Sequence, residues 1–159
     1  RGRILLMMMT NRPDKLDADM KRPGRFDLKI PFFAPETDSH RQQILEALIR
    51  KNKIKHNIED LSLVNAAMTG WTGAELEAAL LSALSLADEG GRDFITQEDL
   101  MAAIQDFIPS RDSAMIELME LLAVFECSSR RLLPKRFQEM TTVEINTRLR
   151  EVNRTLLRA

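Results

Sequence analysis

The chain has 159 residues, 44% of them hydrophobic and 30% charged, which suffices for about one domain at roughly 100–200 residues per domain. Its net charge of −1 excludes a bulk attraction to nucleic acid or anionic membranes, and its longest apolar run, Ile4 to Met9, is too short to span a bilayer. The single cysteine, Cys127, excludes an internal disulfide, and with no visible signal peptide it indicates a reducing, cytoplasmic compartment. Because the first residue is Arg1, we interpret the chain as a fragment or processed piece.

Two short strands are expected near the N-terminus. The apolar run from Ile4 to Met9 has the length of a strand buried on both faces, as in a parallel sheet. A second candidate strand extends from Leu28 to Phe33 and is ended by Pro35. Two isolated strands do not make a stable sheet, so the rest of that sheet is expected upstream, outside this chain.

A helical pattern follows and predicts four helices that form one compact unit over residues 36–108. Apolar side chains recur three and four residues apart in each of them. Two of the four begin at a capping box or a similar pattern, in which a Thr is followed three residues later by an acidic residue. The predicted helices begin at Thr37 or Asp38, at Glu59, at Thr72 and at Thr96, and the last is stopped by Pro109.

The tail after Pro109 predicts further helices. One has a broad apolar face and is followed by a break at Pro134; the last begins at a capping box, Thr141 to Glu144. The two apolar faces should pack on each other or on the four-helix unit, because neither can remain in water. The faces consist of Met115, Leu118, Met119, Leu122 and Phe125, and of Ile145, Leu149, Val152 and Leu156.

Three motifs resemble the AAA ATPases. Residues 10–14, Thr-Asn-Arg-Pro-Asp, and residues 22–27, Arg-Pro-Gly-Arg-Phe-Asp, are similar to the second region of homology of that family. Residues 70–76, Gly-Trp-Thr-Gly-Ala-Glu-Leu, resemble its lid signature. The resemblance covers about residues 4–108, and the tail from Pro109 resembles no family that we can name.

This resemblance implies a mainly α fold built around the AAA+ C-terminal helical lid, a four-helix unit at 35–108. Residues 1–34 would be the C-terminal remnant of the large α/β subdomain, carrying two strands of its truncated sheet. Residues 109–159 would be a C-terminal helical extension.

The resemblance also implies catalytic roles for Asn11, Arg22 and Arg25. Asn11 would be the sensor residue, whose amide can hold the attacking water while it contacts the γ-phosphate. Taken alone, the residue is better explained as a turn residue before Pro13, because Asn is a frequent turn former. Arg22 and Arg25 would be paired arginine fingers that meet charge in the neighbouring subunit's site. On spacing alone they are two surface arginines near Asp19 and Asp27; the complete motif favours fingers.

Cofactor binding is implied for Gly73 and Ala74, at the start of the lid helix beside the adenine, where small residues allow close approach. An ordinary capped helix start is compatible with this role. The chain departs from many relatives at Leu48, where they carry a histidine that reaches the nucleotide; His40 lies earlier, in the first turn of that helix. A polar contact from that helix is therefore in doubt.

Several catalytic motifs are missing from the chain. It contains no G-x-x-x-x-G-K-[ST] and no apolar strand that ends in an Asp-Glu pair, so alone it should not hydrolyse ATP. ATP with Mg²⁺ would be bound by the intact protein, through phosphate and metal ligands outside this chain. No metal site with recognisable spacing occurs. The absence of H-E-x-x-H argues against the membrane-anchored AAA proteases.

The expected function is ATP hydrolysis in a homo-oligomeric ring, a hexamer, that remodels or unfolds protein substrates. A non-catalytic helical interaction module with a vestigial sensor segment is the alternative. An ATPase acting on DNA is disfavoured by the balanced charge, and we expect neither a nucleic-acid partner nor a membrane contact in this segment. Arg150, Arg154 and Arg158 share one face of the last helix, which is either solvated or a partner surface.

Overall fold

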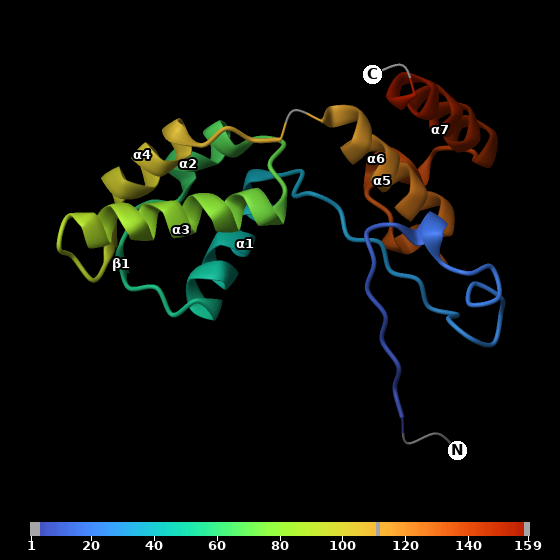
Figure 1. The fold of residues 1–159 in the computed structure, drawn as a ribbon, viewed down its shortest axis with the longest axis horizontal. Helices are drawn as coiled ribbons and strands as arrows, with labels where there is room; N and C mark the ends of the chain where they lie inside the picture. The colour runs from blue at the N-terminus through green and yellow to red at the C-terminus, as the bar shows by residue number, and fades with distance from the viewer. Residues whose placement is uncertain (1–3, 111, 158–159) are drawn as a thin grey trace. The chain divides into compact units, whose positions relative to one another are not determined.

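The computed structural model describes residues 4–110 and 112–157 and confirms a mainly helical fold (Figure 1). The chain forms two compact units, one of residues 33–110 and one that joins residues 4–32 to the tail from 112 onward. The predicted boundaries at 1–34, 35–108 and 109–159 describe the domains of the AAA family, whereas these two units are defined by contacts within the chain. The predicted boundaries therefore stay a prediction.

The unit at 33–110 contains the four helices that the sequence predicts. They are α1 (Asp38–Lys51), α2 (Ser62–Asn65, continued by the 3-10 turn η2, Ala66–Met68), α3 (Gly73–Glu89) and α4 (Gln97–Asp106). The long helix α3 packs against both α1 and α4. Its side chains Leu76, Leu80 and Ala83 are fully buried and form the centre of the core. This confirms the prediction of a compact four-helix unit.

Capping boxes fix the start of α3 and α4. The Thr72 hydroxyl accepts from the Glu75 amide at 3.3 Å, while the Thr72 amide donates to the Glu75 carboxylate at 2.7 Å. Thr96 and Asp99 repeat this arrangement at α4, with corresponding distances of 3.3 and 2.8 Å. Each box satisfies amides that an unfinished helix end would leave without partners.

A short sheet that the sequence did not indicate closes one side of this unit. Strand β1 (His56–Asn57) pairs in parallel with β2 (Ile95–Thr96), with His56 opposite Ile95. Ile95 is fully buried, whereas both β1 residues are exposed. Two-residue strands have no alternation of apolar and polar residues, so no sequence pattern marks them.

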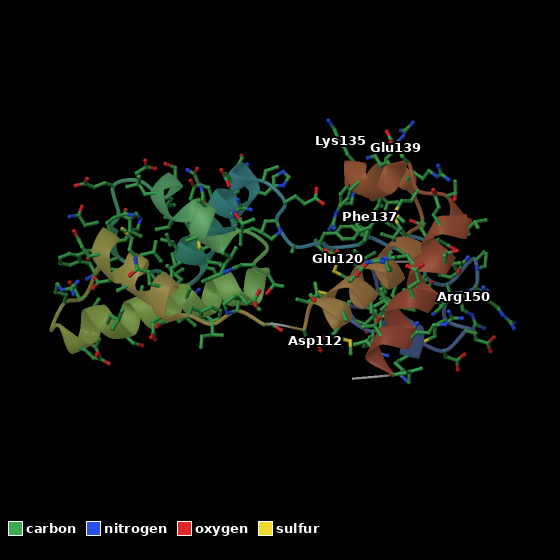
Figure 2. The ribbon with its side chains drawn as sticks, turned by 90° about the horizontal axis from the view of Figure 1, so that it is seen from above. Asp112, Glu120, Lys135, Phe137, Glu139 and Arg150 are labelled. Carbon is green, nitrogen blue, oxygen red and sulfur yellow. The ribbon has the colours of Figure 1, made fainter. Side chains whose placement is uncertain are left out.

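The second unit is built on helices α5 (Ser113–Glu126) and α7 (Thr142–Leu156), joined by the 3-10 turn η3 (Arg130–Leu132) and the short helix α6 (Lys135–Gln138). Helices α5 and α7 pack on each other, as their apolar faces predicted. Figure 2 shows Phe137 on the inner side of α6 and the exposed Lys135 and Glu139 on its outer side.

The two strands predicted near the N-terminus are not strands in this structure. The segments at 4–9 and 28–33 are extended but belong to no sheet; within the described residues, the only sheet is β1 with β2. A strand requires a neighbouring strand with which it forms a ladder of hydrogen bonds, and among the described residues neither segment has one. Ile4 and Phe32 are each 89% exposed. No helix among the described residues has the length and apolarity required to cross a bilayer.

Candidate functional site

The segment from Thr10 to Asp27 is an irregular loop between the two extended segments. It contains one 3-10 turn, η1 (Pro13–Lys15), which lies against α5. Hydrogen bonds between neighbouring residues stabilise this turn. The Arg12 amide donates to the Thr10 hydroxyl at 3.0 Å, and the Arg12 guanidinium donates to both oxygens of the Asp14 carboxylate at 2.9 and 2.7 Å.

Asn11 is exposed at the start of this loop. Thr10, rather than Asn11, accepts the hydrogen bond of the turn, and no side chain caps η1. Within the described residues the Asn11 amide therefore has both its donor and its acceptor available. The sensor role implied by the family resemblance stays a prediction.

Arg22 and Arg25 converge on a single residue, Asp19. The Arg22 guanidinium lies 3.1 Å from the Asp19 carboxylate, and the Arg25 guanidinium donates to the Asp19 backbone carbonyl at 2.9 Å. The Arg22 side chain is nevertheless 72% exposed. The surface-arginine alternative correctly anticipated the contact with Asp19, whereas Asp27 binds the backbone instead.

Gly24 shapes the turn between the two arginines. Its φ of +88° lies in the left-handed region, which glycine adopts without steric cost. Its amide donates to the Asp27 carboxylate at 2.6 Å. Arg22 and Arg25 thus project from one tight turn.

Gly73 and Ala74 are the first two residues of α3, in the other unit. A side-chain carbon added at Gly73 would meet no atom within 4 Å and would face open space. Glu75 beside them also accepts the Ser110 amide at 2.7 Å. Burial opposes ionisation of Glu75, but the hydrogen bonds from Thr72 and Ser110 outweigh it and lower its pKa. The adenine-binding role stays a prediction.

The departure at Leu48 has a structural reason. Leu48 is a partly buried member of the core between α1 and its neighbours, so this position contributes packing rather than a polar contact. His40 lies in the first turn of α1, where its backbone amide donates to the Thr37 hydroxyl at 3.2 Å.

The sequence did not reveal a set of residues that hold the loop at residues 21–29, which carries Arg22 and Arg25 and is called the arginine loop below, against the tail. The ammonium groups of Lys21 and Lys29 both contact the Glu126 carboxylate, at 2.7 and 3.2 Å. The Lys29 amide donates to the Ser128 hydroxyl at 3.2 Å, and the Ser128 amide donates to the Lys29 carbonyl at 3.3 Å. About a hundred residues separate the partners, so no local sequence signal reveals them.

Neither the tail pocket nor the titratable groups define a metal site. A cavity of about 190 Å³ between α5, α6 and α7 is lined mostly by apolar side chains, together with Cys127 and Arg130. Among residues 4–110 and 112–157, no three His, Cys, Asp or Glu side chains are grouped as metal ligands would be. Arg158 of the predicted arginine stripe lies outside the described residues; Arg150 and Arg154 are exposed.

Asp14 should titrate near pH 2, because the hydrogen bonds from Arg12 lower the pKa of this carboxyl from 3.8 to about 2. The pKa is depressed in the fold, so the pair's stabilising effect is complete above about pH 3.8 and is lost as the pH falls through about 2. Carbon-detected NMR titration measures this directly. Arg12→Met should return the midpoint toward 3.8, and added salt should raise it, since the pair is exposed. An Asp14 midpoint unmoved by Arg12→Met would contradict the assignment.

Comparison with known proteins gives no matching family model, but it does give curated relatives. The chain is 38% identical over 119 residues to the ATP-dependent zinc metalloprotease FtsH 3 of Petrotoga mobilis, covering 74% of this chain and 18% of that protein. It is 39% identical over 119 residues to FtsH of Pseudothermotoga lettingae, covering 74% and 19%. It is 42% identical over 100 residues to FtsH of Thermus thermophilus, a match that covers 63% of this chain and 16% of that protein. The chain thus spans less than a fifth of the length of these relatives.

These matches confirm the family resemblance that the three motifs indicated. The chain belongs to the AAA ATPases and represents a C-terminal AAA region. Within that family, the relatives named above are ATP-dependent zinc metalloproteases of the FtsH type. The absence of H-E-x-x-H predicted that the chain is not related to the AAA proteases, and this prediction is wrong. A protease motif in another part of a protein does not bear on the ancestry of its AAA region.

Proposed function

We propose that the full-length protein hydrolyses ATP in a homo-oligomeric, hexameric ring and uses the energy to unfold or remodel protein substrates. In this proposal the chain contributes the sensor residue Asn11, the fingers Arg22 and Arg25, and the helical lid. One observation carries it: both arginines leave a single tight turn and meet at Asp19, while most of the Arg22 side chain remains exposed. An exposed guanidinium held by a surface carboxylate can be transferred to an anion of a neighbouring subunit.

The chemistry asked of these residues is positioning and charge stabilisation. Phosphoryl transfer spreads negative charge over the transferred group, and a guanidinium near that group stabilises it. Arg22 and Arg25 would supply such charge from outside the subunit that binds the nucleotide. Asn11 would orient the attacking water through its free amide, since amides both donate and accept.

The lid would supply the nucleotide contacts of this chain. Gly73 and Ala74 fit the adenine end of ATP, because a Cβ at Gly73 would face open space and Ala74 is exposed. The phosphates and Mg²⁺ need groups that this sequence does not contain, so their ligands would lie outside it.

Proteolysis is not part of this proposal. Its sequence contains no H-E-x-x-H, and its described part presents no cluster of His, Cys, Asp and Glu that fits zinc. The free thiol of Cys127 supports a reducing, cytoplasmic compartment as part of the proposal.

ATP turnover by the full-length protein tests the proposal against the alternative of a non-catalytic interaction module. The proposal requires Mg²⁺-dependent ATP hydrolysis that increases with ring assembly, and ATP-dependent unfolding of a fluorescent protein substrate. Protein binding without any hydrolysis by the assembled protein would favour the interaction module.

The isolated 159-residue chain should bind ATP weakly and hydrolyse none. The phosphates carry most of the ligand's charge, and the loop that would cradle them is absent from this sequence. Titration calorimetry with the purified chain should detect no binding at micromolar ATP. A micromolar dissociation constant would show that the lid alone recognises the nucleotide and would contradict this assignment of roles.

A further inference from the structure

Both ends of the arginine loop are fixed to one carboxylate of the C-terminal extension. Lys21, which directly precedes Arg22, contacts one oxygen of Glu126 at 2.7 Å, and Lys29 contacts the other at 3.2 Å. The Lys29 ammonium also donates to the Lys21 carbonyl at 3.4 Å. This closes the loop at its base, with Arg22 and Arg25 on the part that projects.

The fixed end belongs to a well-packed element. Glu126 is the last residue of α5, which packs against α7 and whose side chains Leu118 and Leu121 are buried. The Glu126 side chain is only 19% exposed, and the lysine side chains are 23% and 30% exposed. The hydrogen bonds of the Lys29 backbone to the hydroxyl and amide of Ser128 add a second attachment directly beside it.

We propose that Glu126 is a positioning residue for ATP hydrolysis, through which the C-terminal helical extension holds the loop of Arg22 and Arg25 in the conformation that a neighbouring subunit's site requires. This inference rests on the proposed function. It assigns a catalytic consequence to the tail, the part of the chain for which no motif predicted one.

The electrostatics of the cluster support such a role. Burial opposes ionisation of Glu126, but the hydrogen bonds from Lys21 and Lys29 outweigh it, so the pKa of this carboxyl is lowered. Replacing the carboxylate by an amide would leave two ammonium groups close together without an anion between them. Their repulsion would open the base of the loop and release the two arginines from a fixed orientation.

The test compares Glu126→Gln with Glu139→Gln in the full-length protein. Glu139 is an exposed residue at the end of α6 (Figure 2) with no ion pair recorded among the described residues, so it controls for the loss of one tail carboxylate. We expect Glu126→Gln to lower kcat by about 10- to 100-fold, the effect of a small misplacement of catalytic groups, with KM for ATP unchanged. Amide hydrogen exchange in residues 22–28 should accelerate in this variant alone.

Two further variants separate positioning from general damage. Lys21→Met removes the contact with Glu126 from the loop side and leaves α5 unchanged. It should lower kcat, as Glu126→Gln does. The charge reversal Lys21→Glu/Lys29→Glu/Glu126→Lys should restore most of the kcat that Glu126→Gln loses. A kcat for Glu126→Gln and Lys21→Met equal to that of Glu139→Gln would overturn the inference, as would a loss that the reversal does not recover. If Arg25→Ala itself left turnover normal, the proposed function would fail first.

Discussion

Arg25→Ala in the full-length protein should lower ATP turnover by about 10³- to 10⁵-fold, the range that arginine fingers supply. Nucleotide binding should change little, because in the proposed ring Arg25 would meet the nucleotide held by another subunit and would act mainly in the transition state. Single-turnover hydrolysis measures the first quantity, and binding of a fluorescent nucleotide analogue measures the second.

The chemistry of the side chain sharpens this expectation. Arg25→Lys should recover little, since an ammonium is a point charge and cannot reproduce the planar fork of donors. Arg131→Ala is the matched control: it removes an exposed arginine of η3 that forms no ion pair with the other described residues, and its turnover should be normal. Near-normal turnover in Arg22→Ala/Arg25→Ala would leave the finger assignment without support.

Leu80→Ala should reduce the free energy of unfolding of the 33–110 unit by about 2–5 kcal/mol. Leu80 lies in the middle of α3 with none of its surface exposed, so the substitution leaves a cavity among side chains from α1, α3 and α4. Its neighbour Leu81 is 44% exposed, and Leu81→Ala should cost only about 0.5 kcal/mol.

A single tryptophan makes this measurement specific to one unit. Trp71 is buried in the core of the 33–110 unit, with its ring centroid 4.9 Å from that of Phe107. Its fluorescence during urea denaturation therefore follows this unit and not the tail. Equal midpoints for Leu80→Ala and Leu81→Ala would contradict the packing described for α3.

Local chemistry explains why most helices were predictable. Thr72 with Glu75 and Thr141 with Glu144 are pairs three residues apart, and each forms the capping box that its sequence suggests. Apolar periodicity predicted that α5 and α7 would pack. The prediction of N-terminal strands was wrong for a physical reason: an apolar run gives the propensity for a strand, but among the described residues no neighbouring strand lies beside either segment.

In the candidate site too, local motifs were predictable from the sequence and long-range contacts were not. The motif at 22–27 located two arginines, and the structure adds that both turn to Asp19. The attachment of Lys21 to Glu126 could not be predicted, because a contact between residues 105 positions apart depends on the packing of α5 rather than on any local pattern. The two-residue strands β1 and β2 were missed because they are too short to have a period.

The claim that the fingers act between subunits is tested most directly by mixing two inactive proteins. One carries Arg25→Ala with its phosphate loop intact; the other keeps Arg25 but lacks the phosphate-loop lysine expected upstream. Native mass spectrometry verifies mixed rings, and wild-type subunits diluted into a doubly inactive partner establish that sites fire independently. With that control positive, we predict that ATPase activity returns in the mixture, because some interfaces pair an intact loop with an intact finger. A mixture that stays as inactive as its components would contradict the account.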